Sequence, residues 1–180
     1  MAESKTNIVR KCLRMRNDLS WGFYLCDFLF RRILRQNANT TWAVHHTSTI
    51  HSPEKIQRGI GVFPGDSPGV YINAINGIQI GDYTNIGPNV GLISANHNVI
   101  NNELPVKAEP IRIGKHCWIG KGANILPQVV LGDFTIVGAG SIVTKSFEEG
   151  YCIVAGNPAK KIKELNPKEC IDFAKTKQSI

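Results

Sequence analysis

The sequence predicts an all-β domain built as a parallel β-helix, in which short strands wind around one apolar core. Three regularities predict this fold. An aliphatic residue recurs at every sixth position, glycine often follows it directly, and a small or β-branched residue often stands four places after it. The aliphatic positions are Ile80, Ile86, Leu92, Ile113, Ile119, Ile125, Leu131, Val137 and Val143.

A period of six fits neither of the two simplest secondary structures, because an amphipathic helix repeats every 3.6 residues and a half-buried strand every two. Six residues fit a short strand followed by a tight turn. Three such units close one triangular coil, and stacked coils hydrogen-bond as parallel sheets. The small companion residues are Thr84, Val90, Cys117, Ala123, Val129, Thr135 and Ser141, and a fainter repeat precedes them at Val44, Ile50, Ile56 and Val62.

The repeat is interrupted twice. Leu92 and Ile113 are 21 positions apart, which is not a multiple of six. The polar segment between them predicts a loop over 97–110 that projects from the coils, and long loops on a regular scaffold often carry function. A shorter irregular stretch, rich in glycine and proline, lies at 63–69.

The flanking segments predict helices. A helix over 7–36 would place apolar residues on one face, namely Trp21, Tyr24, Leu25 and Phe28. We expect it to pack against the open end of the β-helix. The expected parts of the chain are a basic helical N-terminal extension at 1–40, the β-helix domain at 41–158 and a short C-terminal helical segment at 159–180, with a break at Asn166-Pro167.

Positive charge is concentrated at the N-terminus. The 180-residue chain has a formal net charge of +7, and residues 1–36 contribute eight basic against three acidic side chains, or +5. No nucleic-acid-binding motif accompanies this charge, so we expect no nucleic-acid partner. The basic helix could instead contact an anionic membrane surface peripherally. The apolar stretch 19–30 is too short and too charged to span a bilayer.

The five cysteines are an odd number without a CxxC pair, which argues against a disulfide framework and a tetrathiolate zinc site. The N-terminus also lacks the pattern of a cleavable signal peptide. A reducing cytoplasm is therefore the expected compartment. We interpret the cysteines as small buried residues, with an acyl-cysteine mechanism as a minor alternative.

Several motifs carry a resemblance that covers about residues 70–165. They are Ile86-Gly-Pro-Asn-Val, Ser94-Ala-Asn-His97, Ile111-Arg-Ile-Gly-Lys-His-Cys-Trp-Ile-Gly120, Val137-Gly-Ala-Gly-Ser-Ile-Val-Thr-Lys145 and Ala155-Gly-Asn-Pro-Ala-Lys160. With them the sequence resembles the hexapeptide-repeat acetyltransferases, above all the maltose, galactoside, nodulation-factor and exopolysaccharide-synthesis O-acetyltransferases. The resemblance implies a left-handed β-helix, a homotrimer with active sites between subunits, acetyl-CoA as the donor, and no metal.

The resemblance also assigns roles to individual residues. It implies His97 as the general base and Asn73 as a contact to the acceptor, although an Asn can equally stabilise a corner through its amide. It implies a CoA-binding set of Trp118, Lys121, Ala139, Thr144, Lys145, Lys160 and Lys163. The alternative for these lysines is that they are ordinary solvated surface charges. We interpret the other histidines as surface turn residues.

The chemistry expected of His97 follows from its imidazole. A sugar hydroxyl is a poor nucleophile at neutral pH, and a neutral imidazole can remove its proton as the oxygen attacks a thioester carbonyl. Backbone N–H groups along the coil could stabilise the resulting oxyanion. The sequence therefore predicts an acetyl-CoA-dependent O-acetyltransferase that acts on a sugar or glycan hydroxyl.

Three alternatives remain at this stage. The same fold could acetylate an amine, serine or an antibiotic, although serine acetyltransferases carry a larger helical N-terminal domain than this chain offers. It could form a zinc carbonic anhydrase with His46, His51 and His97 as ligands. It could also be a non-catalytic scaffold, in which case His97 would be dispensable.

Overall fold

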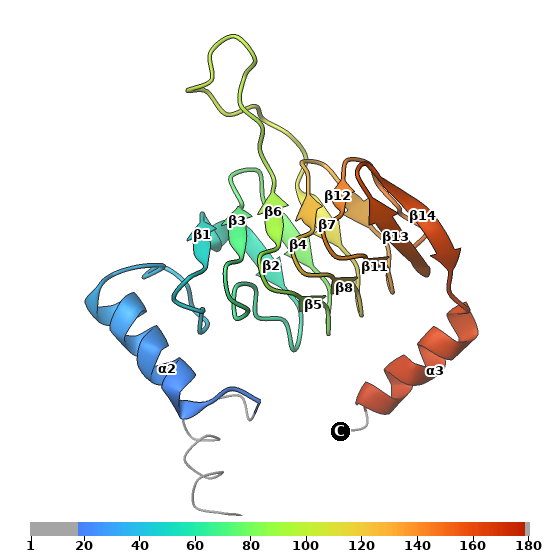
Figure 1. The fold of residues 1–180 in the computed structure, drawn as a ribbon, viewed down its shortest axis with the longest axis horizontal. Helices are drawn as coiled ribbons and strands as arrows, with labels where there is room; N and C mark the ends of the chain where they lie inside the picture. Colours follow the sequence, from blue (N-terminus) through green and yellow to red (C-terminus); the bar gives the residue numbers. More distant parts are fainter. Residues whose placement is uncertain (1–17, 179–180) are drawn as a thin grey trace, which may run out of the picture.

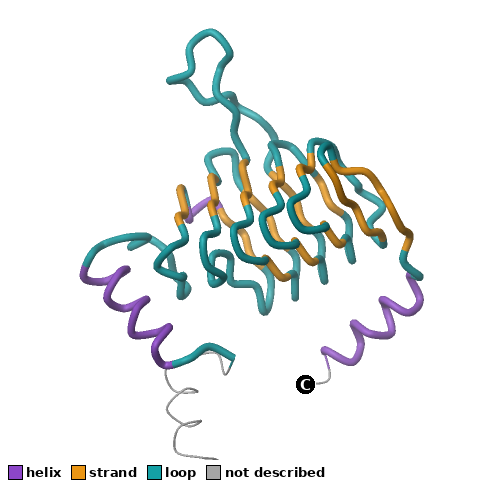
Figure 2. Tube along the Cα trace, viewed as in Figure 1, coloured by secondary structure: helices purple, strands orange, loops and turns teal. Residues whose placement is uncertain are grey.

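Three β-sheets, which we name A, B and C, form the sides of a prism in the computed structural model, which describes residues 18–178. Each turn of the chain contributes a segment to each side, and the turns stack along the long axis (Figures 1 and 2). Sheet A contains β1 (Thr49–His51), β3 (Tyr71–Asn73), β6 (Gly91–Ile93), β9 (Asn124–Ile125) and β12 (Ile142–Val143). Sheet B contains β2 (Ile56–Arg58), β4 (Ile78–Ile80), β7 (Ile111–Ile113) and β10 (Val130–Leu131). Sheet C contains β5 (Asn85–Ile86), β8 (Trp118–Ile119), β11 (Ile136–Val137), β13 (Cys152–Gly156) and β14 (Ala159–Glu164).

The repeat residues line the inside of the prism, as the sequence predicts. The nine aliphatic residues from Ile80 to Val143 are each at most 4% exposed, and their seven small companions from Thr84 to Ser141 at most 3%. The fainter upstream repeat, from Val44 to Val62, is buried as well. Burying one such aliphatic side chain contributes roughly 1.5–3 kcal/mol, so these residues, on all three sheets, make up much of the core.

The register of the strands explains both interruptions. Ile113 pairs with Leu131, 18 positions later, which is the length of one regular coil. Ile80 pairs with Ile113, 33 positions later, so this coil carries 15 extra residues. They form the loop that projects at the top of Figure 1. Arg58 pairs with Ile80, 22 positions later, so the irregular stretch at 63–69 adds four residues to its coil.

The corners of the prism define three edges, which we name by the sheets that they join. Edge AB contains residues 52–55, 74–77, 94–110, 126–129 and 144–146. Edge BC contains residues 59–61, 81–84, 114–117, 132–135 and 149–151. Edge CA contains residues 65–69, 87–90, 120–123 and 138–141.

The N-terminal extension meets the first coil through polar contacts. Its described part forms α2 (Trp21–Asp27), which continues as a π-helix, η1 (Phe28–Ile33), while residues 1–17, which include part of the expected helix over 7–36, lie outside the described residues. The buried Asp27 accepts from the Val44 backbone N–H at 2.9 Å and pairs with Arg31 at 2.6 Å. Arg31 also donates to the Thr40 carbonyl. An arginine therefore points inward, and polar bonds fix the helix to the coil.

The apolar face of this extension differs from what a simple end cap would show. Leu25 is 71% exposed and Phe28 56%, and several neighbouring apolar residues are also exposed. The helix therefore turns much of its apolar face away from the coil end. The reason is that Asp27 and Arg31, which share the opposite face, have backbone and charge partners at the first coil.

The C-terminal segment corrects the expectation of a helix directly after residue 158. Residues Ala159–Glu164 form β14, which pairs antiparallel with β13, and the helix α3 begins only at Pro167 and ends at Gln178. A hairpin forms here because β13 would otherwise leave an unpaired strand edge, which a local apolar pattern cannot reveal. Within residues 18–178, the remaining helical element is the 3-10 turn η2 (Pro53–Lys55). Within the described residues, no helix is long and apolar enough to cross a membrane.

Candidate active site

The projecting loop on edge AB is an ordered arm and not an open coil. Two backbone bonds, from the Asn98 N–H to the Leu104 carbonyl and from the Val106 N–H to the Asn96 carbonyl, join its two sides. The Asn98 side-chain oxygen accepts from the Ile100 and Asn101 N–H groups at 2.9 and 3.0 Å and fixes the turn. The loop thus has a hairpin-like base. This geometry fixes the place of His97.

His97 stands at the start of this arm with an exposed ring. It forms an antiparallel bridge with Pro105, and its Nδ1 lies 2.5 Å from the Asn102 carbonyl oxygen. A carbonyl oxygen has no proton to give, so Nδ1 must carry the hydrogen. In the neutral ring Nε2 then holds a free lone pair, which is the form that a general base needs.

Asn76 is a positioning residue that sequence reasoning missed. Its side-chain Nδ2 donates to the carbonyl oxygens of Ser94 and Val106, at 3.0 and 2.8 Å, so one amide clamps both ends of the arm. Its own backbone N–H donates to the Ser94 hydroxyl at 2.9 Å. Nothing in the local pattern of the sequence marks it, because the two carbonyls lie 18 and 30 positions away in the chain.

Asn73 lies on the strand next to the one that leads into the arm. It pairs in register with Ile93, and its carbonyl accepts from the Ser94 N–H at 2.9 Å. Its side-chain oxygen accepts from the Ile75 N–H at 3.1 Å, which is the corner-stabilising arrangement. Asn73 is thus at the base of the His97 arm, while its role toward an acceptor stays a prediction.

Trp118, Lys121 and Ala139 occupy sheet C and edge CA. Trp118 lies on β8 with 55% of its surface exposed. Lys121 and Ala139 are exposed at the corners of two consecutive coils, which are joined by a bond from the Gly140 N–H to the Lys121 carbonyl at 2.9 Å. These three residues therefore form one accessible strip, with a flat ring and exposed backbone.

The other four residues of the expected CoA-binding set lie elsewhere. Thr144 and Lys145 are exposed on edge AB, two strands of sheet A beyond the start of the arm, or about 10 Å at the usual strand spacing. The Lys145 ammonium lies 5.9 Å from the ring centroid of Phe147. Lys160 and Lys163 are exposed on β14. The structure therefore does not gather the seven residues into one site within a single chain.

The two halves of the expected active site lie on different edges of the prism. His97 is on edge AB, whereas Trp118 is on sheet C and Lys121 and Ala139 are on edge CA. Sheet A separates the two edges, and its strands β1, β3, β6 and β12 are labelled in Figure 1. One chain alone therefore presents His97 on one edge and the strip of Trp118, Lys121 and Ala139 on other sides of the prism.

An open groove of about 580 Å³ lies beside the base of the arm. It is lined by Lys55, Gln57, Ile75, Asn76, Gly77, Pro105, Lys107 and Ala108. Asn76, Lys55 and Lys107 supply polar and positive groups, and Pro105 bridges to His97. The groove therefore adjoins the arm at Pro105, the bridge partner of His97.

The remaining histidines have aromatic neighbours, which for His51 is an edge-on contact with Tyr71. His45 and His46 stack at a centroid distance of 4.4 Å, and burial lowers the pKa of His45. His116 stacks between Tyr83 and Phe134, and burial lowers its pKa as well. Among residues 18–178, no three His, Cys, Asp or Glu side chains lie close enough together to hold a metal ion.

The described cysteines are free, and two of them are buried in the coil. Burial raises the pKa of the Cys117 thiol to about 11, and it also raises the pKa of Cys152. A thiol with so high a pKa is almost entirely protonated at neutral pH, and the protonated form is a poor nucleophile. The geometry therefore disfavours an acyl-cysteine on Cys117.

Comparisons with known proteins agree with this architecture. Residues 110–145 match a family model described as bacterial transferase hexapeptide (six repeats). A galactoside O-acetyltransferase from Escherichia coli K12 is 41% identical over 96 residues, which cover 51% of this chain and 46% of that protein. A protein from the same organism named for an acetyltransferase of colanic acid biosynthesis, WcaF, is 33% identical over 112 residues, covering 62% and 60%.

Solved structures give the same result. A maltose O-acetyltransferase from Clostridium difficile 630 superposes with a TM-score of 0.59 at 28% identity, covering 66% of this chain and 64% of that one. AntD, an N-acyltransferase from Bacillus cereus solved with dTDP and coenzyme A, has a TM-score of 0.63 at 23% identity, covering 78% and 90%, and shows the fold alone. The likeness implies the left-handed sense of the coil. The chain spans about half the length of the curated relatives that it matches.

Proposed function

This chain resembles the hexapeptide-repeat acetyltransferases, and on that premise we propose that it transfers an acetyl group from acetyl-CoA to a hydroxyl of a sugar or glycan, with His97 as the general base. One observation carries this proposal. The Nδ1–H of His97 is held by the Asn102 carbonyl, which leaves Nε2 as the accepting nitrogen at the mouth of the arm. The sugar-acting names of the relatives support the acceptor class.

The proposed reaction needs no covalent enzyme intermediate. Nε2 of His97 takes the proton of the acceptor hydroxyl while its oxygen attacks the thioester carbonyl. The tetrahedral intermediate then collapses, the C–S bond breaks, and the proton passes to the leaving thiolate. The products are an acetyl ester and free CoA. The rigid coil contributes by holding both substrates in the reacting geometry.

We propose that a neighbouring copy of the chain completes the site, in a homotrimer. The division of residues supports this, because His97 and Trp118 lie on different edges of one prism. A second copy that turns its sheet C toward the arm of the first would bring its exposed Trp118 close to His97 of the first copy. The tip of the arm fits such a contact, because Val99 is 98% and Ile100 94% exposed.

The strip of Trp118, Lys121 and Ala139, which we name the donor strip, fits the chemistry of a thioester with a pantetheine arm. Trp118 offers an exposed flat ring, and the corner at Ala139 offers exposed backbone to an amide-rich chain. Lys160 and Lys163 stand exposed on β14, where they can attract the phosphates of CoA. AntD was crystallised in complex with coenzyme A, which supports a donor of this kind.

The test is an acceptor screen with acetyl-CoA, in which released thiol is measured for mono- and oligosaccharides. His97→Gln should lower turnover about a hundredfold or more while the oligomeric state, measured by sedimentation, stays unchanged. His51→Gln is the matched control, because His51 is an exposed histidine on β1, directly before edge AB, and its ring contacts Tyr71. Full activity of His97→Gln would refute the proposal.

The same screen separates the alternatives. An amine acceptor acetylated faster than any hydroxyl would replace O- by N-transfer, the reaction named for AntD. Equal loss of a hydratase activity in His51→Gln and His97→Gln, together with stoichiometric zinc, would favour the carbonic anhydrase alternative. A protein that binds no acetyl-CoA would be a scaffold.

We also propose that the N-terminal extension contacts an anionic membrane surface from the cytoplasm. Leu25 and Phe28 are exposed beside the exposed basic side chains of Arg32 and Arg35, a combination typical of interfacial helices. Sedimentation with phosphatidylglycerol vesicles tests this. The double variant Leu25→Glu and Phe28→Glu should lose binding, whereas Ile162→Glu, at a site 64% exposed on β14, should retain it. No binding of the unaltered protein would refute the proposal.

A further inference from the structure

Edge BC repeats an unusual corner in every coil. Tyr83, His116, Phe134 and Tyr151 all have a positive φ, between 46° and 57°. Successive corners are joined by equivalent backbone bonds, such as that from the Tyr83 N–H to the Ile60 carbonyl. By the same pattern of bonds, the residue that corresponds to them in the first coil is the one after Ile60. That residue is Gly61, which has a φ of 71°.

The four aromatic side chains stack into a ladder along this edge. Their ring centroids are 5.2, 4.8 and 5.5 Å apart, and neighbouring planes differ by 19°, 12° and 18°. A fifth ring at Gly61 would continue the ladder, and a Cβ there would lie 3.2 Å from Cδ1 of Tyr83. Because glycine has no side chain, the rung before Tyr83 is missing.

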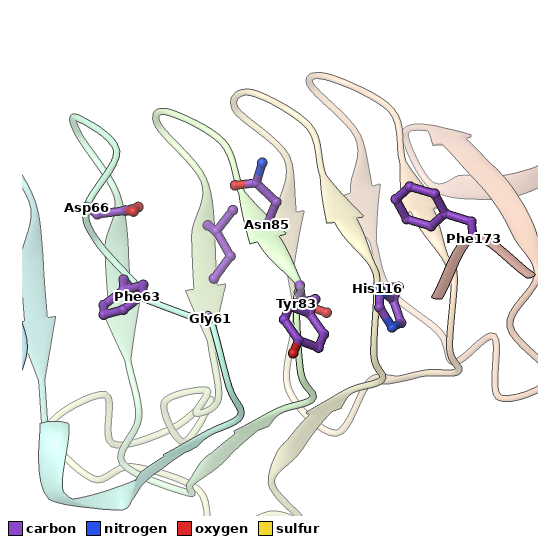
Figure 3. Close-up of a pocket in the computed structure, with 9 residues that line it drawn as sticks. Gly61, Phe63, Asp66, Tyr83, Asn85, His116 and Phe173 are labelled. Atoms are coloured by element: carbon purple, nitrogen blue, oxygen red, sulfur yellow. The ribbon is translucent and has the colours of Figure 1, made fainter. Parts of the chain in front are cut away.

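The missing rung coincides with a hollow of about 290 Å³. Figure 3 shows Tyr83 on one side of Gly61, with Phe63 and Asp66 on the other. Asn85 lies on the adjoining strand β5. Phe173 of α3, which is 52% exposed, contacts His116 edge-on at 6.3 Å and also lines the hollow. The hollow thus combines ring faces with a carboxylate and an amide.

We propose that this hollow binds the nucleobase of a nucleotide, which stacks on Tyr83 where a fifth ladder ring would lie. The ladder already holds near-parallel rings, so the site favours a planar ring over the thicker chair of a hexose. Stacking on an aromatic ring suits every base, because each has a π-face. The Asn85 amide can donate and accept, and the Asp66 carboxylate can accept from an N–H on the base edge.

Two sources could supply the base, namely a nucleotide that carries the acceptor and the adenine of CoA. The hollow lies on edge BC between Gly61 and His116, whereas Thr144 and Lys145 lie on edge AB of the last coil and Lys160 lies on β14. We therefore assign it to a nucleotide-linked acceptor. This assignment rests on the proposed function, but the base site itself does not, because binding can be measured without turnover.

The experiment is a titration of the full chain with UMP, AMP and CoA, followed by saturation-transfer NMR of the base protons. Ribose 5-phosphate is the control without a base and should bind at least tenfold more weakly. Gly61→His adds a ring of the kind that His116 already places at a positive φ, and it should weaken nucleotide binding at least tenfold. Tyr83→Leu removes the stacking face and should do the same. Phe134→Leu removes a ladder ring that does not line the hollow, and the nucleotide affinity of this variant should stay within twofold of that of the unaltered chain.

The outcomes separate the possibilities. Failure of every nucleotide to bind at millimolar concentration, or unchanged affinity in both Gly61→His and Tyr83→Leu, would overturn the base site. Circular dichroism melting of each variant excludes loss of fold as the cause. If CoA competes with UMP and loses affinity in Gly61→His, the base site stands and the acceptor assignment falls. A chain that transfers no acetyl group but binds UMP at Tyr83 would refute only the proposed function.

Discussion

The clamp made by Asn76 can be tested by removing its amide. Asn76→Ala deletes the bonds from Nδ2 to the carbonyls of Ser94 and Val106, at 3.0 and 2.8 Å. At about 1 kcal/mol for each bond, the arm should lose about 2 kcal/mol of local stability. The coil should be little affected, because the buried core residues lie behind the corner and keep their contacts.

Hydrogen exchange measures this effect directly. The amide protons of Asn98 and Val106 close the arm by bonds to Leu104 and Asn96, and local opening governs their exchange. A loss of about 2 kcal/mol corresponds to exchange about 30-fold faster. Turnover should fall, because His97 is less often in place. The KM for acetyl-CoA should stay within twofold, because the donor strip, which includes Trp118, lies on other sides of the prism.

Two further variants make the test decisive. Asn76→Asp keeps the shape of the side chain but turns a donor into an acceptor that faces two carbonyls. The amide protons of its arm should therefore exchange at least as fast as those of Asn76→Ala. Asn124→Ala removes a comparable bond, from its Nδ2 to the Gly122 carbonyl at 3.3 Å on edge CA, and should leave the arm unchanged. Unaltered exchange at Asn98 and Val106 in Asn76→Ala would refute the clamp.

Three other predictions concern stability. Ile119→Ala, at a fully buried site, should lower the free energy of unfolding in denaturant by about 2–5 kcal/mol. Trp118→Ala, at the adjacent exposed site, should lower it by less than about 0.5 kcal/mol. Equal losses would contradict the assignment of Ile119 to the inside and Trp118 to the outside of the prism. Asp27→Ala removes the carboxylate that pairs with Arg31 and accepts from the Val44 N–H, so exchange of the Val44 amide should accelerate. Protection equal to that of the unaltered chain would show that the extension is held by other contacts. Burial raises the pKa of Cys117 to about 11, so the folded state binds this proton more tightly than the unfolded state. Its contribution to stability should therefore be complete below about pH 8.5–9, the range of an ordinary thiol, and disappear as pH rises toward 11. Cys117→Ala should show a weaker loss of stability over that interval, and an identical pH profile would refute the attribution.

The regular part of the fold was predictable because every coil packs its inward side chains into the same kind of internal space. Ile113 and Leu131 differ in sequence context, but each must fill the same internal space, so the period of six survives in the sequence. The position of the arm was predictable for the same reason, since it interrupts that period. His97 could be singled out because it stands at this interruption, and its catalytic role stays a prediction.

Other features depend on contacts that a linear pattern does not contain. The Asn76 clamp joins carbonyls 18 and 30 positions away, and the ring ladder joins residues whose spacing changes from coil to coil. The strand β14 was missed because its formation depends on the free edge of β13 and not on its own composition. The separation of His97 from Trp118 requires knowledge of which side each strand occupies.

The last strand has a consequence for how many coils can be stacked. A parallel coil ends in an unpaired strand edge that resembles the edge already used by every coil before it, so the stack has no built-in limit. On sheet C this edge is covered by β14, which runs in the opposite direction and carries Lys160, Lys161 and Lys163 on exposed positions. An incoming chain would meet reversed backbone polarity and a row of positive charges. The hairpin thus closes this side of the solenoid against end-to-end growth into a fibre.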